Sequence, residues 1–419
     1  MNAYRRPRRT GAETRPASES VEARHRAPGR RLLAALVVPL AALIAACASA
    51  SPGGGTAGPD SATAQRLDAA IAKVMKQASI PGAIVGLWRP GQSPYVKTFG
   101  ERSTSTKQPM SRNLYMRIGS QTKTFTATAA LQLVDQGKVG LDDPISRYVT
   151  GVPSGDGITI RELAGMRSGL FSYTADEDFV HALQSDPQRS FTPQQLLTYA
   201  LRHPLVFAPG TGFQYSNTNT VLLGLVVEKV SGQTLPAYLQ EHVFAPLHLS
   251  HTSFPTDSTF PTPHADGYTE QTLDGKRADA TDWNPSWGWA AGAMISTLDD
   301  LHTWAPALAT GKLLTPATQA QRLKVVTMAG APSNGYGLGI FDIDGWIGHN
   351  GSLPGYQTLA VYLPAQHATL VVLTNTDIGY RGNATTTLLG KAITEIVSPQ
   401  HVYSLPAAAQ DPEPTPAAG

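Results

Sequence analysis

The sequence predicts an α+β fold, in which helices flank an antiparallel sheet that is built from both ends of the chain. Strand signals occur near residues 82–100 and again after residue 336, on either side of a region rich in helix and loop signals. That region, about 150–280, is expected to form an inserted, mainly helical subdomain. A chain of 419 residues, 41% of them hydrophobic, is long enough to bury a full-sized core.

The first elements follow in chain order. A helix is expected over 62–77, and strands are expected over 82–89 and 95–100. The next helix begins at Gln121 and stops at Gly137. It is apolar nearly all round, as expected of a helix buried at the centre of a domain.

The rest of the sheet is expected toward the C-terminal end of the chain. Its strands are predicted at 336–341, 356–362 and 369–374. A last helix is expected to run to about Val397. The helix from Gln121 would then lie at the junction of the sheet and the insertion, a usual place for a binding site.

Residues 1–46 are expected to be a signal peptide of the lipoprotein type. Residues 1–31 carry nine arginines and three glutamates, and an apolar run from Leu32 to Ala46 follows them. This run is too short to span a bilayer comfortably. Cys47 comes directly after it and is the expected lipidation site, with an ordinary secretion signal as the alternative.

The segments next to the expected folded part are simple in composition. Residues 47–60 are rich in glycine and proline and read as a flexible tether, and residues 401–419 are expected to be a disordered tail. Removing 1–46, with its excess of six positive charges, changes the net charge from +2 to about −4. Nothing in this balance suggests a nucleic-acid surface.

Metal and cofactor chemistry finds no support in the motifs. Cys47 is the single cysteine, which excludes a disulfide within the chain and a cysteine-rich zinc site. No H-E-x-x-H segment occurs, and no G-x-S-x-G segment of an α/β-hydrolase occurs either. The sequence therefore predicts neither a metal nor a cofactor.

Ser120 and Lys123 are the first candidate catalytic residues. They lie three positions apart at the start of the predicted central helix, so their side chains share one face. A serine hydroxyl is a poor nucleophile until a nearby base takes its proton. Lysine could be that base if burial and neighbouring cations lowered its pKa by about three units.

Two further motifs follow downstream. Tyr215 and Asn217 form a Tyr-x-Asn triplet, and His349 opens the segment His-Asn-Gly-Ser. Tyr215 is a candidate second proton carrier, because a phenolate beside two cations can act as a base. Asn217 could hold Lys123 and bind a substrate amide. His349 is expected to keep the site electropositive and could shuttle a proton, because imidazole titrates near neutrality.

In this order the three motifs resemble the signature of the serine penicillin-recognising enzymes. The chain resembles the branch with class C β-lactamases and secreted DD-carboxypeptidases, and flanking segments such as Met116–Gly119, Met166–Leu170 and Trp287–Met294 fit as well. The resemblance spans roughly residues 65 to 397. It implies a β-lactamase/transpeptidase-like fold, with a catalytic domain over 61–400.

The resemblance also implies an oxyanion hole from the backbone N–H groups of Ser120 and Ser352, next to Gly351. The chain departs from the family in having Asn350 at the centre of the third motif, where threonine is usual. The segment leading into that motif also lacks the arginine that carboxypeptidases place there. Arg381 could replace it, or could be a solvated loop arginine.

The activity expected from this resemblance is that of a serine hydrolase with a Ser120 acyl-enzyme. D-alanyl-D-alanine carboxypeptidase-like cleavage of D-amino-acid peptides of the cell wall comes first. A class C-like β-lactamase, an esterase of the same fold and a catalytically silent, lipid-anchored binding protein are the alternatives. The protein is expected to be a monomer that acts outside the cytoplasm, attached to the bacterial cell membrane by a lipid anchor or secreted.

Overall fold

An eight-stranded antiparallel sheet forms the centre of the computed structural model, which describes residues 61–328 and 331–406. Its strand order is β2-β1-β12-β11-β10-β9-β8-β7. The strands are β1 (Gly82–Trp88), β2 (Tyr95–Gly100), β7 (Val326–Met328), β8 (Ala331–Tyr336), β9 (Phe341–Ile343), β10 (Trp346–Leu353), β11 (Tyr356–Leu363) and β12 (Ala368–Thr374). Because β1 lies between β2 and β12, both ends of the folded region build the sheet, as predicted.

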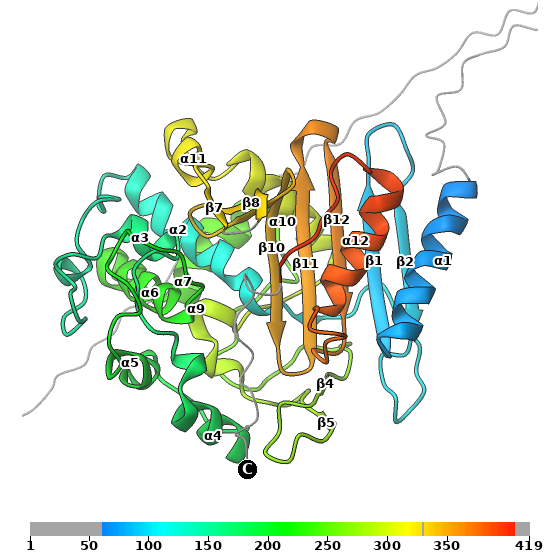
Figure 1. Ribbon diagram of the computed structural model, residues 1–419, viewed down its shortest axis with the longest axis horizontal. Helices are drawn as coiled ribbons and strands as arrows, with labels where there is room; N and C mark the ends of the chain where they lie inside the picture. The colour runs from blue at the N-terminus through cyan, green and yellow to red at the C-terminus, as the bar shows by residue number, and fades with distance from the viewer. Residues whose placement is uncertain (1–60, 329–330, 407–419) are drawn as a thin grey trace, which may run out of the picture. The chain divides into compact units, whose positions relative to one another are not determined.

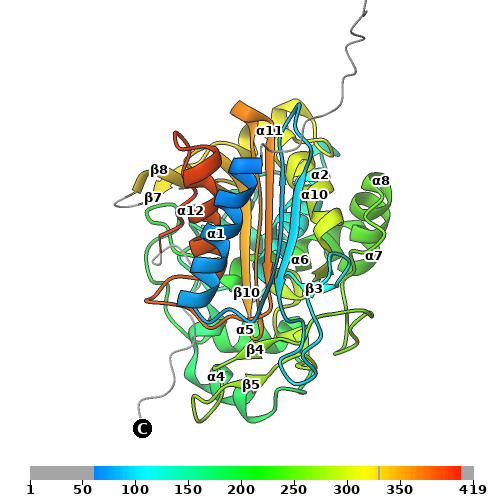
Figure 2. The same cartoon turned by 90° about the vertical axis from the view of Figure 1, so that its right-hand side faces the viewer.

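Helices cover both faces of this sheet. They are α1 (Ser61–Gln77), α2 (Thr122–Asp135), α3 (Ile160–Ala164), α4 (Glu177–Ser185), α5 (Pro193–Leu201), α6 (Asn217–Ser231), α7 (Leu235–Leu239), α8 (Ala245–Leu247), α9 (Trp289–Gly292), α10 (Leu298–Thr310), α11 (Pro316–Arg322) and α12 (Thr385–Val397). Figure 2 shows α1 and α12 on one face and α2 with α10 on the other. Figure 1 shows the helices α3 to α7 beside the sheet, in the predicted insertion.

Two small sheets supplement the main one. The strands β3 (Met116–Arg117) and β6 (Ile295–Ser296) pair just before the first motif, and β4 (Tyr268–Thr269) pairs with β5 (Ala278–Asp279). Short 3-10 turns occur at Gly119–Gln121, Ile145–Arg147, Tyr173–Ala175, Pro285–Trp287 and Pro364–Gln366, and a π-helical turn at Gln240–Phe244 joins α7 to α8. The β3–β6 pair attaches the segment before Ser120 to the segment before α10.

Alternation along the strands separates two apolar cores. On β1, Val85 points into the core beneath α1 and α12, whereas its neighbour Ile84 points into the core shared with α2 and α6. On β12, Val372 and Leu373 divide in the same way. This is the period-2 pattern of a sheet that is covered on both faces.

Two elements near the third motif differ from the prediction. The strand predicted at 336–341 is wrong: β8 ends at Tyr336 and β9 begins at Phe341, and between them Gly337 N donates to Ile340 O across a turn. The sequence analysis also missed β10, which carries the third motif. Its sequence, WIGHNGSL, contains glycine and asparagine, which are depleted in strands, so local propensity does not mark it.

The predicted tail begins too early. Tyr403 and Leu405 are each 1% exposed, and Tyr403 N donates to Thr394 Oγ1 of α12 at 2.9 Å. Residues 401–406 therefore pack on the domain, and disorder from residue 401 is wrong for them. The rest of that tail, the signal peptide, Cys47 and the tether lie outside the described residues.

Candidate active site

Ser120 and Lys123 meet at the start of α2. Ser120 lies in the 3-10 turn Gly119–Gln121, which runs directly into the helix. The Lys123 side chain is 1% exposed, and its Nζ donates to Ser120 Oγ at 2.8 Å and to the carbonyl of Ala291 at 2.8 Å. The hydroxyl and the amine are thus within proton-transfer distance, as the motif predicts.

Side-chain hydrogen bonds hold α2 in its place. Thr126 Oγ1 donates to Ala290 O at 2.8 Å, next to the carbonyl that binds Lys123. Trp304 Nε1 of α10 donates to Thr124 Oγ1 at 2.8 Å. These bonds attach the helix to α9 and α10, so Ser120 and Lys123 belong to a helix that is fixed on several sides.

The second motif lies at the start of α6. The ring of Tyr215 has its centroid 4.8 Å from Lys123 Nζ and 6.0 Å from the His349 ring. Asn217 Nδ2 donates to Thr174 Oγ1 at 3.1 Å. The structure therefore brings Tyr215, Lys123 and His349 together, while the expected hold of Asn217 on Lys123 stays a prediction.

The third motif lies on β10, in close backbone contact with the first. Gly119 has φ +53°, and a Cβ there would lie 2.8 Å from the backbone nitrogen of Ser352. A Cβ at Gly351 would collide with the carbonyl oxygen of Ile118. Only glycine permits this approach at both positions. It places the backbone of Ser352 against the turn of Ser120, as the predicted oxyanion hole requires.

Beside the site, one edge of β10 has no strand partner in the described residues. The neighbouring β9 pairs with β10 only at Trp346, Ile347 and Gly348. From His349 to Leu353, β11 is the only strand partner of β10 among residues 61–328 and 331–406. An extended peptide could pair with this half of the strand.

His349 differs from its predicted electrostatic role. Its side chain is buried, and burial together with the nearby charge of Lys123 lowers its pKa to about 3. The imidazole is therefore neutral at neutral pH. The expectation that His349 keeps the site electropositive is wrong. Its imidazole is buried on β10, where a charged ring would lose its hydration.

Asn350 and Arg381 occupy different surroundings. Asn350 is buried on β10, and its carbonyl lies 2.5 Å from His349 Nδ1. Arg381 lies in the exposed turn before α12 with φ 51°, and its guanidinium carbon is 5.2 Å from the Tyr380 ring centroid. Neither distance connects Arg381 with Ser120 or Lys123. Its role in binding a carboxylate stays a prediction.

Two chemical groups that contact the motif residues were not predicted from the sequence. The carbonyl of Ala291 binds Lys123, but a backbone oxygen carries no residue-type signal. Tyr336, at the end of β8, places its hydroxyl 3.3 Å from His349 Nε2. A polar aromatic residue 13 positions before His349 was the available signal for it.

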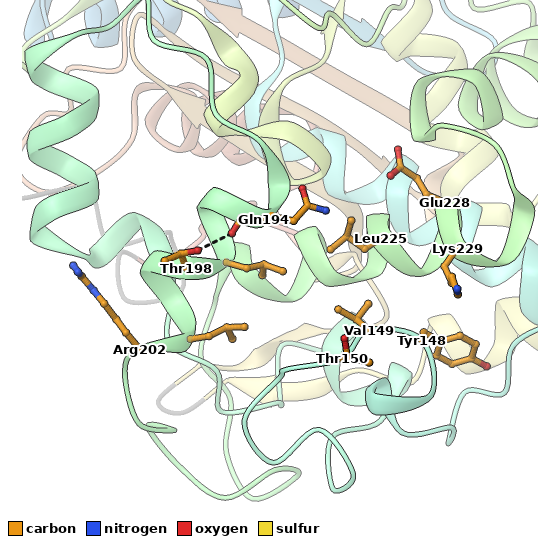
Figure 3. Close-up of a pocket in the computed structure, with 11 residues that line it drawn as sticks. Tyr148, Val149, Thr150, Gln194, Thr198, Arg202, Leu225, Glu228 and Lys229 are labelled. Atoms are coloured by element: carbon orange, nitrogen blue, oxygen red, sulfur yellow. Dashed lines mark hydrogen bonds between the residues drawn. The ribbon is translucent and has the colours of Figure 1, made fainter.

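A separate cavity of about 830 Å³ lies in the helical insertion, between α5, α6 and the segment 148–150 (Figure 3). Leu197, Leu201 and Leu225 contribute apolar lining, and Lys229 lies at its border. None of the predicted catalytic residues lines it. The cavity is therefore distinct from the site around Ser120.

Residues 61–328 and 331–406 contain neither a recognisable metal site nor a helix suited to span a membrane. No group of three or more histidine, cysteine, aspartate or glutamate side chains within them is arranged to hold a metal ion. None of the helices in the same residues combines the length and the apolar character that crossing a membrane demands.

Comparisons with known proteins agree with this geometry. A family model described as Beta-lactamase matches residues 67–392. The chain is 27% identical over 327 residues to Protein flp of Staphylococcus aureus, which covers 75% of this chain and 64% of that protein. It is 25% identical over 322 residues to Penicillin-binding protein 4* of Bacillus subtilis, covering 68% of this chain and 66% of that one. The chain thus spans less than two thirds of flp.

A solved structure shows the same fold. The D-stereospecific amidohydrolase from Streptomyces sp. superposes with a TM-score of 0.71 and 32% sequence identity, covering 81% of this chain and 99% of that one. The superposition thus covers most of this chain and nearly all of the amidohydrolase.

Proposed function

This chain belongs to the beta-lactamase family of serine hydrolases, and from that premise we propose that it cleaves D-amino-acid peptides in the manner of a D-alanyl-D-alanine carboxypeptidase. Ser120 attacks the scissile carbonyl and forms an acyl-enzyme, which water then hydrolyses. The observation that carries the proposal is the 2.8 Å contact between Ser120 Oγ and Lys123 Nζ in a buried setting.

Each step has a residue to perform it. Lys123 acts in its uncharged form when it takes the proton of Ser120, and Tyr215 is the second proton carrier for the leaving group. The backbone N–H groups of Ser120 and Ser352 stabilise the oxyanion, and one such donor typically contributes about 2.7–4 kcal/mol. The contact of Gly119 with Ser352 supports this pairing of donors.

The edge of β10 beside the site supports a peptide as substrate. An extended chain can add to the edge at 349–353 through main-chain hydrogen bonds, which bring its carbonyl toward Ser120. The preference for D-configured residues rests on the similarity to the D-stereospecific amidohydrolase.

A D-amino-acid amidase is the second candidate, and a specific observation favours it. Residues 331–353 contain no arginine or lysine, and the side chain of Arg381 is exposed beside Tyr380. A free C-terminal carboxylate normally needs such a cation. An amide substrate does not, so the two candidates differ in what lies beyond the scissile bond.

The proposed location is outside the cytoplasm, with Cys47 carrying the lipid. Residues 1–60 lie outside the described residues, so this proposal rests on the sequence. In a bacterial host, Cys47→Ala should move the protein from the membrane fraction to the medium. Equal membrane retention of variant and wild type would remove Cys47 as the anchor.

Intact-protein mass after mixing with a penicillin tests the nucleophile, with Ser120→Ala as the control. A lasting gain of one drug molecule, absent from the variant, is expected of a slow-deacylating peptidase. Drug consumed without an adduct would indicate a β-lactamase. Untouched drug with no hydrolysis of peptides, amides or esters would indicate a silent binding protein.

A pair of substrates separates the two peptidase-like candidates. D-Ala-D-Ala peptide with a free carboxylate and the same peptide as its C-terminal amide are hydrolysed in parallel. A carboxypeptidase prefers the carboxylate form, and an amidase cleaves the terminal amide. Residual turnover by Ser120→Ala in either assay would contradict the proposed acyl-enzyme.

A further inference from the structure

Tyr336 lies directly behind the third motif. It ends β8, its side chain is 1% exposed, and its ring meets Phe341 of β9 edge-on at a centroid distance of 4.7 Å. Its hydroxyl lies 3.3 Å from His349 Nε2. A buried phenol of this kind usually has a hydrogen-bond partner, and here the imidazole is that partner.

The other nitrogen of His349 defines which atom carries the proton. His349 Nδ1 lies 2.5 Å from the carbonyl oxygen of Asn350, and a carbonyl can only accept. Nδ1 must therefore be protonated. In a neutral ring Nε2 is then an acceptor, and the Tyr336 hydroxyl is the donor that satisfies it.

The surroundings favour this neutral ring over an imidazolium. The titratable groups that face it in the described residues are Tyr336 from β8, Tyr215 from the segment before α6 and Lys123 from α2. None of them is a carboxylate that could stabilise a charged imidazole. Both ring nitrogens are thus already engaged, and neither is left to carry a proton to the substrate.

We propose that Tyr336 is a positioning residue for the third motif: its hydroxyl donates to His349 Nε2 and, with the Asn350 carbonyl, holds the ring as the neutral Nδ1–H tautomer. His349 then fixes the shape of β10 beside Ser120 rather than shuttling a proton. For catalysis this inference rests on the proposed acyl-enzyme function, but the tautomer is independent of it.

Nitrogen-15 NMR of histidine-labelled protein measures the tautomer directly. The His349 resonances are identified among the 11 histidines by their loss in His349→Gln. The wild type should show Nδ1–H with a hydrogen-bonded, unprotonated Nε2, unchanged between pH 5 and 8. In Tyr336→Phe the Nε2 resonance should move to the position of a free acceptor.

Tyr403→Phe is the matched control. Tyr403 is equally buried, and no hydrogen-bond partner for its hydroxyl exists in the described part of the chain. Its variant should leave the His349 resonances in place. With the substrate proposed above, Tyr336→Phe should lower kcat/KM about five- to tenfold, the effect of one lost hydrogen bond, and Tyr403→Phe less than twofold.

Several results would overturn the inference. An Nε2–H or charged His349 in the wild type at pH 7 would do so, even if Tyr336→Phe does not fold. An unmoved Nε2 resonance in Tyr336→Phe, or equal loss of activity in both tyrosine variants, would also do so. A wild type that turns over no substrate refutes the proposed function alone, because the NMR outcome does not depend on turnover.

Discussion

Helices α1 and α2 lie on opposite faces of the sheet and are held there in different ways. Helix α1 buries a narrow stripe, with Leu67 and Ile71 one turn apart and fully buried. Helix α2 is buried on almost every side, and threonines bind its neighbours through hydrogen bonds. Apolar burial supplies stability without much direction, whereas hydrogen bonds specify position. The helix that carries Ser120 is the one held by directional contacts.

The largest effect is expected on the α1 side. Ile71→Ala removes a fully buried side chain and leaves a cavity, which should lower the free energy of unfolding by about 2–5 kcal/mol. The rate of Ser120 acylation should stay unchanged at temperatures where the variant is folded. Urea unfolding followed by circular dichroism measures the first quantity.

The exposed Lys73 of the same helix provides the control. Lys73→Ala should change the free energy of unfolding by less than about 0.5 kcal/mol. A marked slowing of acylation in Ile71→Ala would contradict the contrast drawn here, because it would show that the α1 side also positions Ser120.

The α2 side should show a specific dependence on pH. Burial lowers the pKa of His349 from 6.5 to about 3, so the unfolded chain binds a proton near pH 6.5 and the folded chain only near pH 3. This group therefore favours unfolding as the pH falls from about 6.5 toward 3, by up to ~1.4 kcal/mol per pH unit. Urea titrations at several pH values measure the slope.

Replacing the imidazole isolates its contribution to that slope. His349→Gln should flatten the dependence of unfolding free energy on pH in this window, while Ile71→Ala should keep it. Equal slopes in wild type and His349→Gln would show that the ring titrates at its ordinary pKa in the folded protein.

A smaller effect is expected from a single threonine of α2. Thr126→Val keeps the shape but leaves the carbonyl of Ala290 without its donor, which should cost about 1–3 kcal/mol. Acylation should also slow, because the adjacent Ala291 carbonyl binds Lys123. The exposed Thr303 of α10 is the matched site, where the same change should alter neither quantity measurably. Similar effects at both threonines would contradict the view that the Thr126 hydrogen bond holds α2 in position.

The smallest effect on stability is expected at Arg381. Arg381→Ala should change the free energy of unfolding by less than about 0.5 kcal/mol, since the side chain is exposed. If it binds a substrate carboxylate, KM should rise up to about fivefold for the free peptide and not for its amide. A higher KM for both substrates, or for neither, would show that Arg381 does not bind the substrate carboxylate.

The same contrast explains what could be predicted from the sequence. The sequence predicted a helix over residues 62–77, and α1 spans Ser61–Gln77. Strand signals in the sequence likewise predicted β1, β11 and β12. Such elements form because their apolar side chains become buried, and the sequence shows directly which side chains are apolar.

Elements defined by distant partners were not predictable in this way. Strand β10 contains residues that favour turns, and its pairing with β11 and β9 makes it a strand. The motifs named Ser120, Lys123, Tyr215 and His349, and the structure brings them together. The neutral state of His349 could not be predicted, because it depends on burial and on Tyr336, which the motif does not include.

The pairing of β1 with β12 has a consequence for how the chain folds. Ala83 pairs with Thr374, so an inner ladder of the sheet joins segments from nearly opposite ends of the folded region. Contacts of such high sequence separation raise the contact order and slow folding. During synthesis the edge of β1 that pairs with β12 stays unpaired until almost the entire domain has been synthesised. The export proposed above would benefit from this delay, because the sheet cannot be completed before its last strands have been synthesised.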